Sequence, residues 1–266
     1  MGGVKVRITI FLIAIFIALA GCTPGDSIKK EPMVKTYADP KICMGEDKDC
    51  VLEVTAFNDA LVNKSNLYLG RNLSLSNIDS HPSLDRVVAS IKYQQDGDTY
   101  AIFLVEHMLI NNGSPDLCHA CTPYMSVVVY QFHNSWKLFA TKLITDFDIG
   151  SWGYYNSKPD DIKILPAGKE HFYLALSNRD GGQGISIDTT EFIGVMSNLI
   201  QNFGLIQTGY DDCGSDIKMC TPWTSSYELK SENGNDVIYL NKKFKDGSHK
   251  IRYEISGIKL QKQNTQ

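Results

Sequence analysis

The feature that most constrains the fold is a series of alternating segments, separated by turn dipeptides, near the C-terminus. Segments 226–231, 236–244 and 250–258 place many apolar side chains at alternate positions, and Asn233-Gly234 and Asp246-Gly247 stand between them. A period of two is typical of strands with one buried face. Asn-Gly and Asp-Gly supply the positive φ angles that two-residue hairpin turns require. The sequence therefore predicts a three-stranded antiparallel meander here.

Similar segments occur earlier in the chain, rich in Val, Ile, Tyr and Phe. We expect strands at 86–94, 99–109, 124–133, 135–145 and 170–176. Asp96-Gly97 and Asn134 lie where tight turns are needed between neighbouring strands.

Helical patterns are weaker. Segments 54–62 and 191–201 have apolar residues near helical spacing, although β-branched Ile193 and Val195 make a strand an equal alternative for the second. The predicted fold class is mainly β: a single disulfide-stapled domain of antiparallel hairpins and meanders, with one or two short helices.

Cysteine usage suggests an oxidising compartment. Apart from Cys22, the cysteines fall into three local pairs: Cys43 and Cys50, Cys118 and Cys121, and Cys213 and Cys220. An even number of cysteines is typical of an exported disulfide framework. Sequence leaves the connectivity open, and local pairing is the simplest expectation.

The sharpest internal motif is Cys118-His119-Ala120-Cys121. A structural disulfide is the leading interpretation. Alternatively, the two thiolates and His119 could bind a metal, with His107 or His133 as a fourth ligand. A second Cys-x-x-Cys arm, which zinc sites usually have, is missing from the sequence.

Two further interpretations of this motif are less favourable. Thr122 follows Cys121, so the motif is not the Cys-x-x-Cys-His of c-type haem attachment. Redox pairs usually begin a helix, and Thr122-Pro123 leads into a strand-like segment instead. We expect no cofactor, and we keep metal or thiol-redox chemistry at Cys118, His119 and Cys121 as the alternative.

Three other segments are weaker candidates. Residues 150–155, with glycines flanking Trp152, predict a tight bend more strongly than a stacking platform. The Gly-rich stretch 178–184 lacks the residues of a phosphate loop and is a candidate loop beside a binding face. The acidic stretches 46–50 and 211–216 match no EF-hand and are expected to be solvated loops.

Composition and charge describe a globular, slightly acidic chain. Hydrophobic residues make up 43% and charged residues 21% of the sequence. Without residues 1–21, 24 basic residues face 30 acidic ones, a formal net charge of −6. Basic residues are scattered, which argues against nucleic acid as a partner.

The N-terminal segment has the parts of a secretory signal. Lys5 and Arg7 precede an apolar run at 8–19, which is short for a membrane-spanning helix. The run ends in Leu19-Ala20-Gly21-Cys22, which resembles the lipobox of bacterial lipoproteins. This resemblance implies removal of the signal before Cys22 and acylation of that cysteine, with palmitate a typical acyl group. Two or three acyl chains would anchor the protein stably to a membrane.

These features predict three parts: a lipoprotein signal peptide at 1–21, a lipidated tether at 22–42 and a β-rich domain at 43–266. The lipoprotein resemblance implies an envelope location, facing the periplasm or the cell surface. By the same resemblance to sorted bacterial lipoproteins, Thr23 in place of an aspartate after the lipidated cysteine would favour the outer membrane.

Residues 99–200 carry a second, looser resemblance. The Cys-His-Ala-Cys motif at 118–121, Trp136-Lys137-Leu138, the Gly-Ser-Trp-Gly block at 150–153 and Gly182-Gln183-Gly184 occur in this order. This part of the chain looks like a group of uncharacterised exported bacterial proteins. The resemblance implies no activity.

No Gly-x-Ser-x-Gly elbow or His-Glu-x-x-His motif occurs in the sequence. We therefore expect a non-catalytic binding or interaction module, with an envelope protein or a small ligand as partner. The rival is the metal or redox protein, and a hydrolase whose site leaves no sequence motif is the weakest option.

Overall fold

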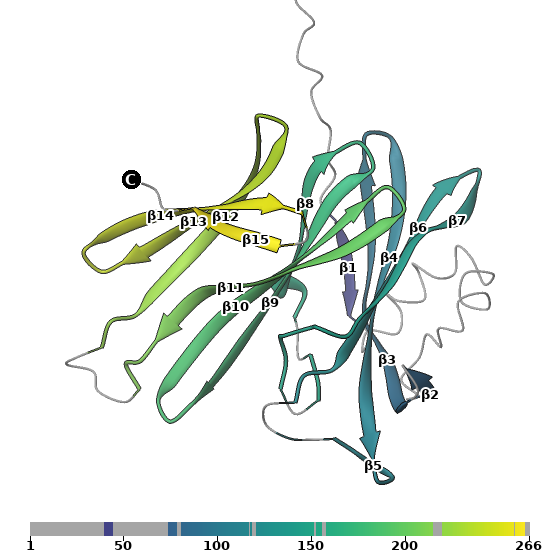
Figure 1. Cartoon of the computed structure of the whole chain (residues 1–266), viewed down its shortest axis with the longest axis horizontal. Helices are drawn as coiled ribbons and strands as arrows, with labels where there is room; N and C mark the ends of the chain where they lie inside the picture. The colour runs from purple at the N-terminus through teal and green to yellow at the C-terminus, as the bar shows by residue number, and fades with distance from the viewer. Residues whose placement is uncertain are drawn as a thin grey trace, which may run out of the picture. The chain divides into compact units, whose positions relative to one another are not determined.

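The computed structural model describes residues 40–44, 74–78, 81–116, 118, 121–151, 153–155, 158–214, 220–257 and 259–263. Within these ranges the chain forms antiparallel strands and one 3-10 turn, η1 (Pro159–Asp161), with no α-helix (Figure 1). The mainly β prediction is confirmed. Cys22, Cys50, His119, Trp152 and the predicted helix at 54–62 lie outside the described residues, as does most of the predicted tether.

The first sheet has the strand order β1-β3-β4-β6-β7, with β2 added on β3 and β5 on β4. Its strands are β1 (Lys41–Met44), β2 (Ser74–Ile78), β3 (His81–Gln95), β4 (Asp98–Asn111), β5 (Ser114–Pro115), β6 (Tyr124–His133) and β7 (Ser135–Ile144). The bounds of β6 are those predicted from the sequence. Asp96, Gly97 and Asn134 all have positive φ angles, as the predicted turns require.

The second sheet is an eight-stranded meander in which each strand pairs with the next. Its strands are β8 (Ile162–Gly168), β9 (His171–Gly182), β10 (Ile185–Met196), β11 (Leu199–Asp211), β12 (Trp223–Glu232), β13 (Asn235–Phe244), β14 (Gly247–Ser256) and β15 (Lys259–Gln263). The predicted C-terminal meander corresponds to β12, β13 and β14.

One of the two predicted C-terminal turns is correct and the other is displaced. Asn233 and Gly234 have φ angles of 53° and 83°, which fits a two-residue turn with both residues left-handed. Gly247 is instead the first residue of β14, where it pairs with Phe244 and has no positive φ. The β13–β14 turn is therefore formed by Lys245-Asp246, and the prediction for Gly247 was wrong.

The helical alternative for 191–201 was also wrong, since this stretch spans the end of β10, a turn at Ser197 and the start of β11. Phe192 and Ile193 are both fully buried, and they face different cores. Burial on both faces removes the apolar–polar alternation by which a strand is normally recognised.

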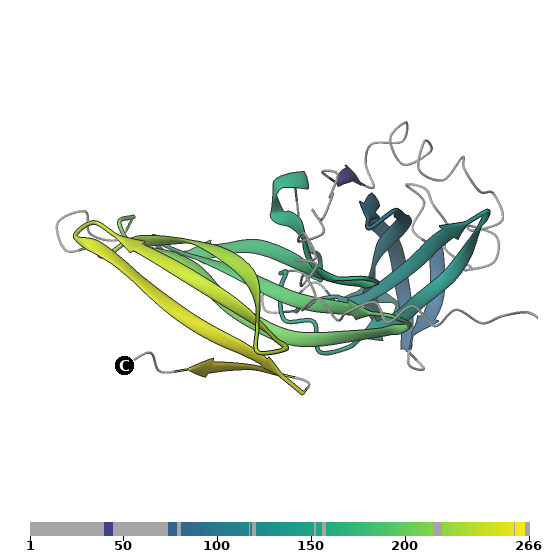
Figure 2. The ribbon, with the colours of Figure 1, turned by 90° about the horizontal axis from the view of Figure 1, so that it is seen from above.

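Strands β8–β11 form the middle of three packed layers (Figures 1 and 2). On one face they pack against the first sheet, and on the other against β12–β15. In β9, Phe172 and Leu174 enter the first core, whereas Tyr173 and Ala175 enter the second. Each large side chain buried in this way stabilises the fold by about 1.5–3 kcal/mol.

Strands β12–β15 can pack over strands β8–β11 of the same sheet because the sheet nearly divides between β11 and β12. Only Gly209–Thr224 and Tyr210–Trp223 pair across this boundary. Beyond these pairs β12 leaves β11, and the meander brings Ile238 of β13 into the core that contains Phe192.

The first sheet also has apolar residues on its outer face, which we define as the face opposite the first core. Ala101 and Phe103 of β4 and Val128 and Tyr130 of β6 form a buried cluster on this face, and Trp136 packs against them.

The connector 145–158 joins the two sheets, and two buried glutamates hold it. Glu191 of β10 accepts hydrogen bonds from Asp148 N at 3.1 Å and from Asn202 Nδ2 at 2.7 Å. Glu106 of β4 accepts from Tyr155 N at 2.9 Å and pairs with Arg86. Each sheet therefore contributes one carboxyl group that binds connector backbone.

The connector also contains the bend predicted around Trp152. Gly150 and Gly153 have φ angles of 116° and 75°, which favour glycine. A Cβ on Gly150 would overlap the carbonyl oxygen of Tyr154, and Gly153 N donates to Cys121 O at 2.8 Å. The Gly-rich motif thus shapes a tight bend, as predicted.

No helix in the described part of the chain has the length and apolar character needed to cross a membrane.

Candidate functional site

Two of the predicted cysteine pairs are disulfides. Cys118 bonds to Cys121, with Cα atoms 5.0 Å apart, and Cys213 bonds to Cys220, with Cα atoms 4.8 Å apart. Cys43 is buried and disulfide-bonded as well. The Cys118–Cys121 bond lies in the connection between β5 and β6, and the Cys213–Cys220 bond lies in the connection between β11 and β12.

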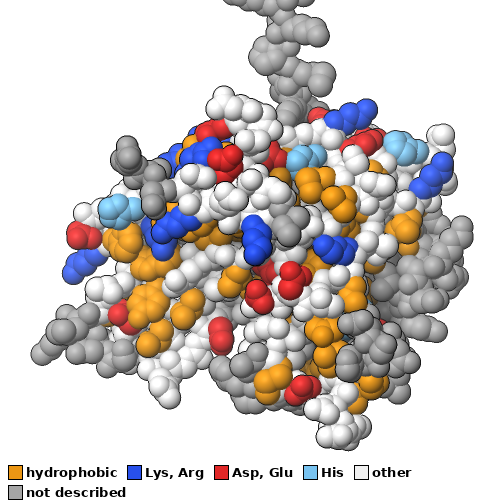
Figure 3. Space-filling model, in the orientation of Figure 1, with side chains coloured by type: hydrophobic (Ala, Val, Ile, Leu, Met, Phe, Trp, Pro, Cys, Tyr) orange, Lys and Arg blue, Asp and Glu red, His pale blue; other side chains and the backbone are white. Residues whose placement is uncertain are grey.

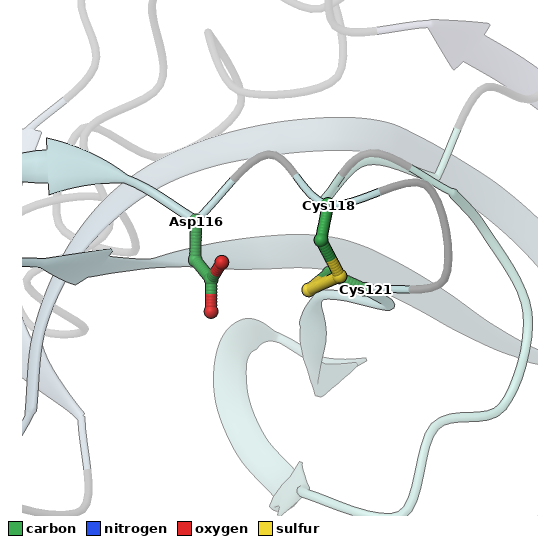
Figure 4. A group of neighbouring side chains, drawn as sticks. All are labelled: Asp116, Cys118 and Cys121. Carbon is green, nitrogen blue, oxygen red and sulfur yellow. A yellow bond between two sulfur atoms is a disulfide. The ribbon is translucent and has the colours of Figure 1, made fainter.

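The Cys118–Cys121 disulfide has an acidic neighbour (Figure 4). A carboxylate oxygen of Asp116 lies within 4.8 Å of both sulfur atoms. Neither His107 nor His133 joins this group, so the predicted fourth metal ligand is not found at these positions. Because the sulfurs are oxidised, they are not the thiolates that a metal would need.

A polar cleft of about 530 Å³ is the best candidate site among the described residues. It lies beside the place where β11 and β12 separate. Its lining comes from η1 with its N-cap residue and from β8 to β12: Lys158, Asp160, Asp161, Lys163, Ser177, Asn178, Arg179, Asp188, Thr190, Thr208, Thr224, Ser225 and Tyr227. The volume lies within the range of small-ligand sites.

A row of hydroxyl groups crosses the cleft from strand to strand. Ser177 Oγ of β9 lies 2.9 Å from Thr190 Oγ1 of β10, which lies 3.1 Å from Thr208 Oγ1 of β11. Ser225 Oγ of β12 continues the row by donating to the Thr208 carbonyl oxygen at 2.5 Å. We call these four residues the hydroxyl row. Each hydroxyl can both donate and accept a hydrogen bond. Thr190 is fully buried and Thr208 is 8% exposed, so the half-buried Ser177 and Ser225 are the members of the row that a ligand reaches most easily.

A β-bulge places Thr208 in this row. Asp188 pairs with Gly209 and Thr189 with Gln207, which leaves Thr208 as the extra residue of β11. A bulge re-aims a side chain relative to the regular pleat. Here it brings the Thr208 hydroxyl into contact with that of Thr190.

One wall of the cleft carries a two-point ion pair between neighbouring strands. Arg179 Nε and Nη2 donate to the two carboxylate oxygens of Asp188 at 2.5 and 2.8 Å. The hydrogen bonds and charge of Asp188 raise the pKa of Arg179. Gly209 makes room for this carboxylate, because a Cβ at that position would overlap Asp188 Oδ2.

Tyr227 is the aromatic residue of the lining. Lys163 Nζ lies 5.1 Å from the centroid of the Tyr227 ring. The Tyr227 hydroxyl oxygen is buried and has no well-aligned hydrogen-bond partner among the residues that the structure describes. Burial raises the pKa of Tyr227 to about 12, against a lowering effect of Ser177. The phenol therefore stays neutral at physiological pH.

The charges of the lining balance. Lys158, Lys163 and Arg179 are matched by three aspartates: Asp160, Asp161 and Asp188. Basic and acidic side chains are likewise interspersed over the face shown in Figure 3. Neither the lining nor this face has the single-sign field that would favour a highly charged ligand.

Sequence reasoning found only the edge of this cleft. The stretch 178–184, predicted as a loop, is mostly strand: β9 runs to Gly182, and only Gln183-Gly184 form the turn. Asn178 and Arg179 of this stretch do line the cleft. The predicted acidic loop contains Asp212, which accepts a hydrogen bond from Thr221 N at 2.8 Å and is not part of the cleft lining.

The hydroxyl row itself had no sequence signal. Its members come from four strands and are common residues on strand surfaces. In comparisons with known proteins, no family model, no curated protein and no solved structure matches the chain. The candidate site therefore rests on geometry alone.

Proposed function

We propose that this protein is a lipid-anchored component of the bacterial cell envelope whose β domain binds a small uncharged, hydroxyl-rich ligand of the saccharide class. The single observation that carries the binding proposal is the hydroxyl row across a cleft with balanced charges. The activity proposed for this cleft is binding without catalysis.

Sugar hydroxyls need partners that both donate and accept, and the hydroxyl row offers such partners. Asn178 adds an amide, and the Arg179–Asp188 pair adds fixed donors and acceptors on one wall. Tyr227 adds an aromatic side chain to the lining, with its ring held between Lys163 and Phe192. These features fit a neutral polar molecule better than an apolar or a highly charged one.

Two features support the envelope location. The Leu-Ala-Gly-Cys tetrad at 19–22 resembles a lipobox, and the disulfides fit an oxidising compartment. A lipid anchor would hold the cleft near the membrane that carries it.

Ligand titration of the oxidised, full-length protein tests the binding proposal. The probes are glucose, N-acetylglucosamine and maltose. Binding of each probe is followed by the chemical shifts of the protein in two-dimensional NMR spectra. We expect one of them to shift resonances of the cleft residues. Thr208→Val should then raise the dissociation constant of that ligand about fivefold, because one lost hydrogen bond is worth about 1 kcal/mol.

Thr141→Val is the matched control, because Thr141 is an exposed threonine of β7 in the other sheet. Its dissociation constant should equal that of the wild type. The binding proposal is wrong if no probe shifts the cleft resonances, or if Thr141→Val weakens binding as much as Thr208→Val does.

The metal or redox alternative keeps one supporting observation, the carboxylate of Asp116 beside the Cys118–Cys121 disulfide. If this pair were reduced in the cell, Asp116 and two thiolates could offer three ligands. Alkylation of protein isolated under denaturing, non-reducing conditions, followed by peptide mapping, separates the two functions. We expect no free thiol at Cys118 or Cys121, whereas two free thiols would favour the alternative.

A further inference from the structure

A second cluster of polar residues lies on the outer face of the first sheet, away from the cleft lining. It consists of Ser83 and Asp85 on β3, His107 on β4 and Ser126 on β6. Asp85 pairs directly with His107, and Ser126 pairs with Val105, two residues before His107. Alternate residues of a strand share a face, so this register places all four side chains on the face that carries Phe103.

Contacts within this cluster run in one line. His107 Nδ1 lies 2.9 Å from Asp85 Oδ1, and His107 Nε2 lies 2.7 Å from Ser126 Oγ. Ser83 Oγ donates to Asp85 Oδ1 at 2.7 Å. The Asp85–His107 contact is not aligned as a hydrogen bond. In free enzymes such contacts are often misaligned and tighten only when substrate binds.

The residues of this line differ in burial. The Ser83 residue is fully buried and His107 is 4% exposed, so the ring is held in place. Asp85 and Ser126, the two contacts of the ring, are both half-buried, so Ser126 is not sealed off from a small substrate. The order is a carboxylate, an imidazole and a reachable hydroxyl, which is the arrangement that activates a serine.

We propose that Ser126 is a nucleophile activated by His107, with Asp85 as the positioning residue, and that this site hydrolyses small carboxylic esters. This activity is independent of the cleft and of the ligand proposed there. It names residues for the hydrolase function that the sequence analysis considered without a motif.

The reaction balances with water as the only co-reactant. Ser126 Oγ attacks the ester carbonyl carbon and passes its proton to His107 Nε2. The bond from the carbonyl carbon to the alcohol oxygen breaks, and the leaving alkoxide takes the proton from His107. Water then attacks the acyl-serine ester, again giving a proton to His107. The acyl–Oγ bond breaks, the acid leaves and Ser126 regains its proton.

Chemical labelling tests the proposal without any substitution. The oxidised full-length protein is treated with a fluorophosphonate probe and then mapped by peptide mass spectrometry. We expect the phosphonyl adduct on Ser126, and little on Ser248, an exposed serine of β14. An unlabelled Ser126, or equal labelling of both serines, would overturn the proposal.

Hydrolysis of p-nitrophenyl acetate gives the second test. Ser126→Ala and His107→Gln should each lower the rate of hydrolysis about 100-fold, which is the usual contribution of an activated nucleophile and its base. Asp85→Asn should lower the rate less, and Ser248→Ala should leave it unchanged. A rate that survives in Ser126→Ala would exclude this serine, whatever the stability of the other variants.

Discussion

Glu191 should make the stability of the domain depend on pH. The Glu191 residue is fully buried, and burial raises its pKa from 4.5 to about 8, despite opposing hydrogen bonds from Asn202 and Asp148. Between these two pH values the folded protein keeps a proton that the unfolded chain has released. The stabilisation is therefore fully present below about pH 4.5 and is lost as pH rises through about 8.

The expected magnitude follows from the two pKa values. They differ by about 3.5, and one pKa unit corresponds to about 1.4 kcal/mol, so the loss is of order 5 kcal/mol between the two limits. Burial also raises the pKa of Glu106, against the nearby charge of Arg86. Its contribution has the same sign, but it is present in both proteins compared below.

The test variant is Glu191→Gln, which is neutral at every pH. Its amide offers an acceptor to one of the two donors, Asp148 N and Asn202 Nδ2, and an unwanted NH₂ to the other. We expect a loss of about 1–3 kcal/mol at pH 5. As pH rises to 8, the free energy of unfolding should fall much less in the variant than in the wild type.

Urea unfolding at pH 5, 6, 7 and 8 measures both free energies. Glu228→Gln is the control, since Glu228 lies on β12 with its side chain 43% exposed and should leave the pH dependence of the wild type nearly unchanged. The reasoning fails if Glu191→Gln shows the same decline as the wild type. It also fails if wild-type stability rises from pH 5 to 8.

Gly209→Ala should destabilise the domain by about 1–3 kcal/mol and displace Asp188, measured by urea unfolding and by loss of the cleft NMR shifts. Gly234→Val should cost about 1 kcal/mol or more because of its φ of 83°, whereas Gly247→Val, where a Cβ meets nothing within 4 Å, should cost little in the same assay. Cys22→Ser should abolish lipid attachment, and acyl chains in the intact mass of this variant would contradict the lipoprotein proposal.

Sequence reasoning succeeded for the meander β12–β14, because its alternation and its turn residues agree. It also found β4, β6 and β9, which are buried on both faces, from their runs of Val, Ile, Tyr and Phe. It missed β8 and β11, and it left β10 open between a helix and a strand. The Asp246-Gly247 dipeptide was predicted as the turn, whereas the turn lies one residue earlier, at Lys245-Asp246. A glycine fits the start of a strand as well as a turn, so the sequence did not separate the two.

The candidate site was largely beyond sequence reasoning for a different reason. Its groups come from several strands, and only the pairing register brings them together. The bulge that re-aims Thr208 depends on how β10 and β11 align, and no local sequence pattern predicts it. Asn178 and Arg179 were the exception, because a Gly-rich hairpin end is visible in the sequence.

The two-sided middle layer bears on how this chain can be made and truncated. A nascent chain that has emerged only as far as residue 211 would expose Tyr173, Phe192 and Phe203, which β13 and its neighbours later cover. The meander β12–β15 is built from neighbouring hairpins, which form faster than long-range pairings. This segment, which is synthesised after β8–β11, is thus quick to fold and is required to seal the domain. Any truncation within it would leave an aggregation-prone apolar face for chaperones or proteases to recognise.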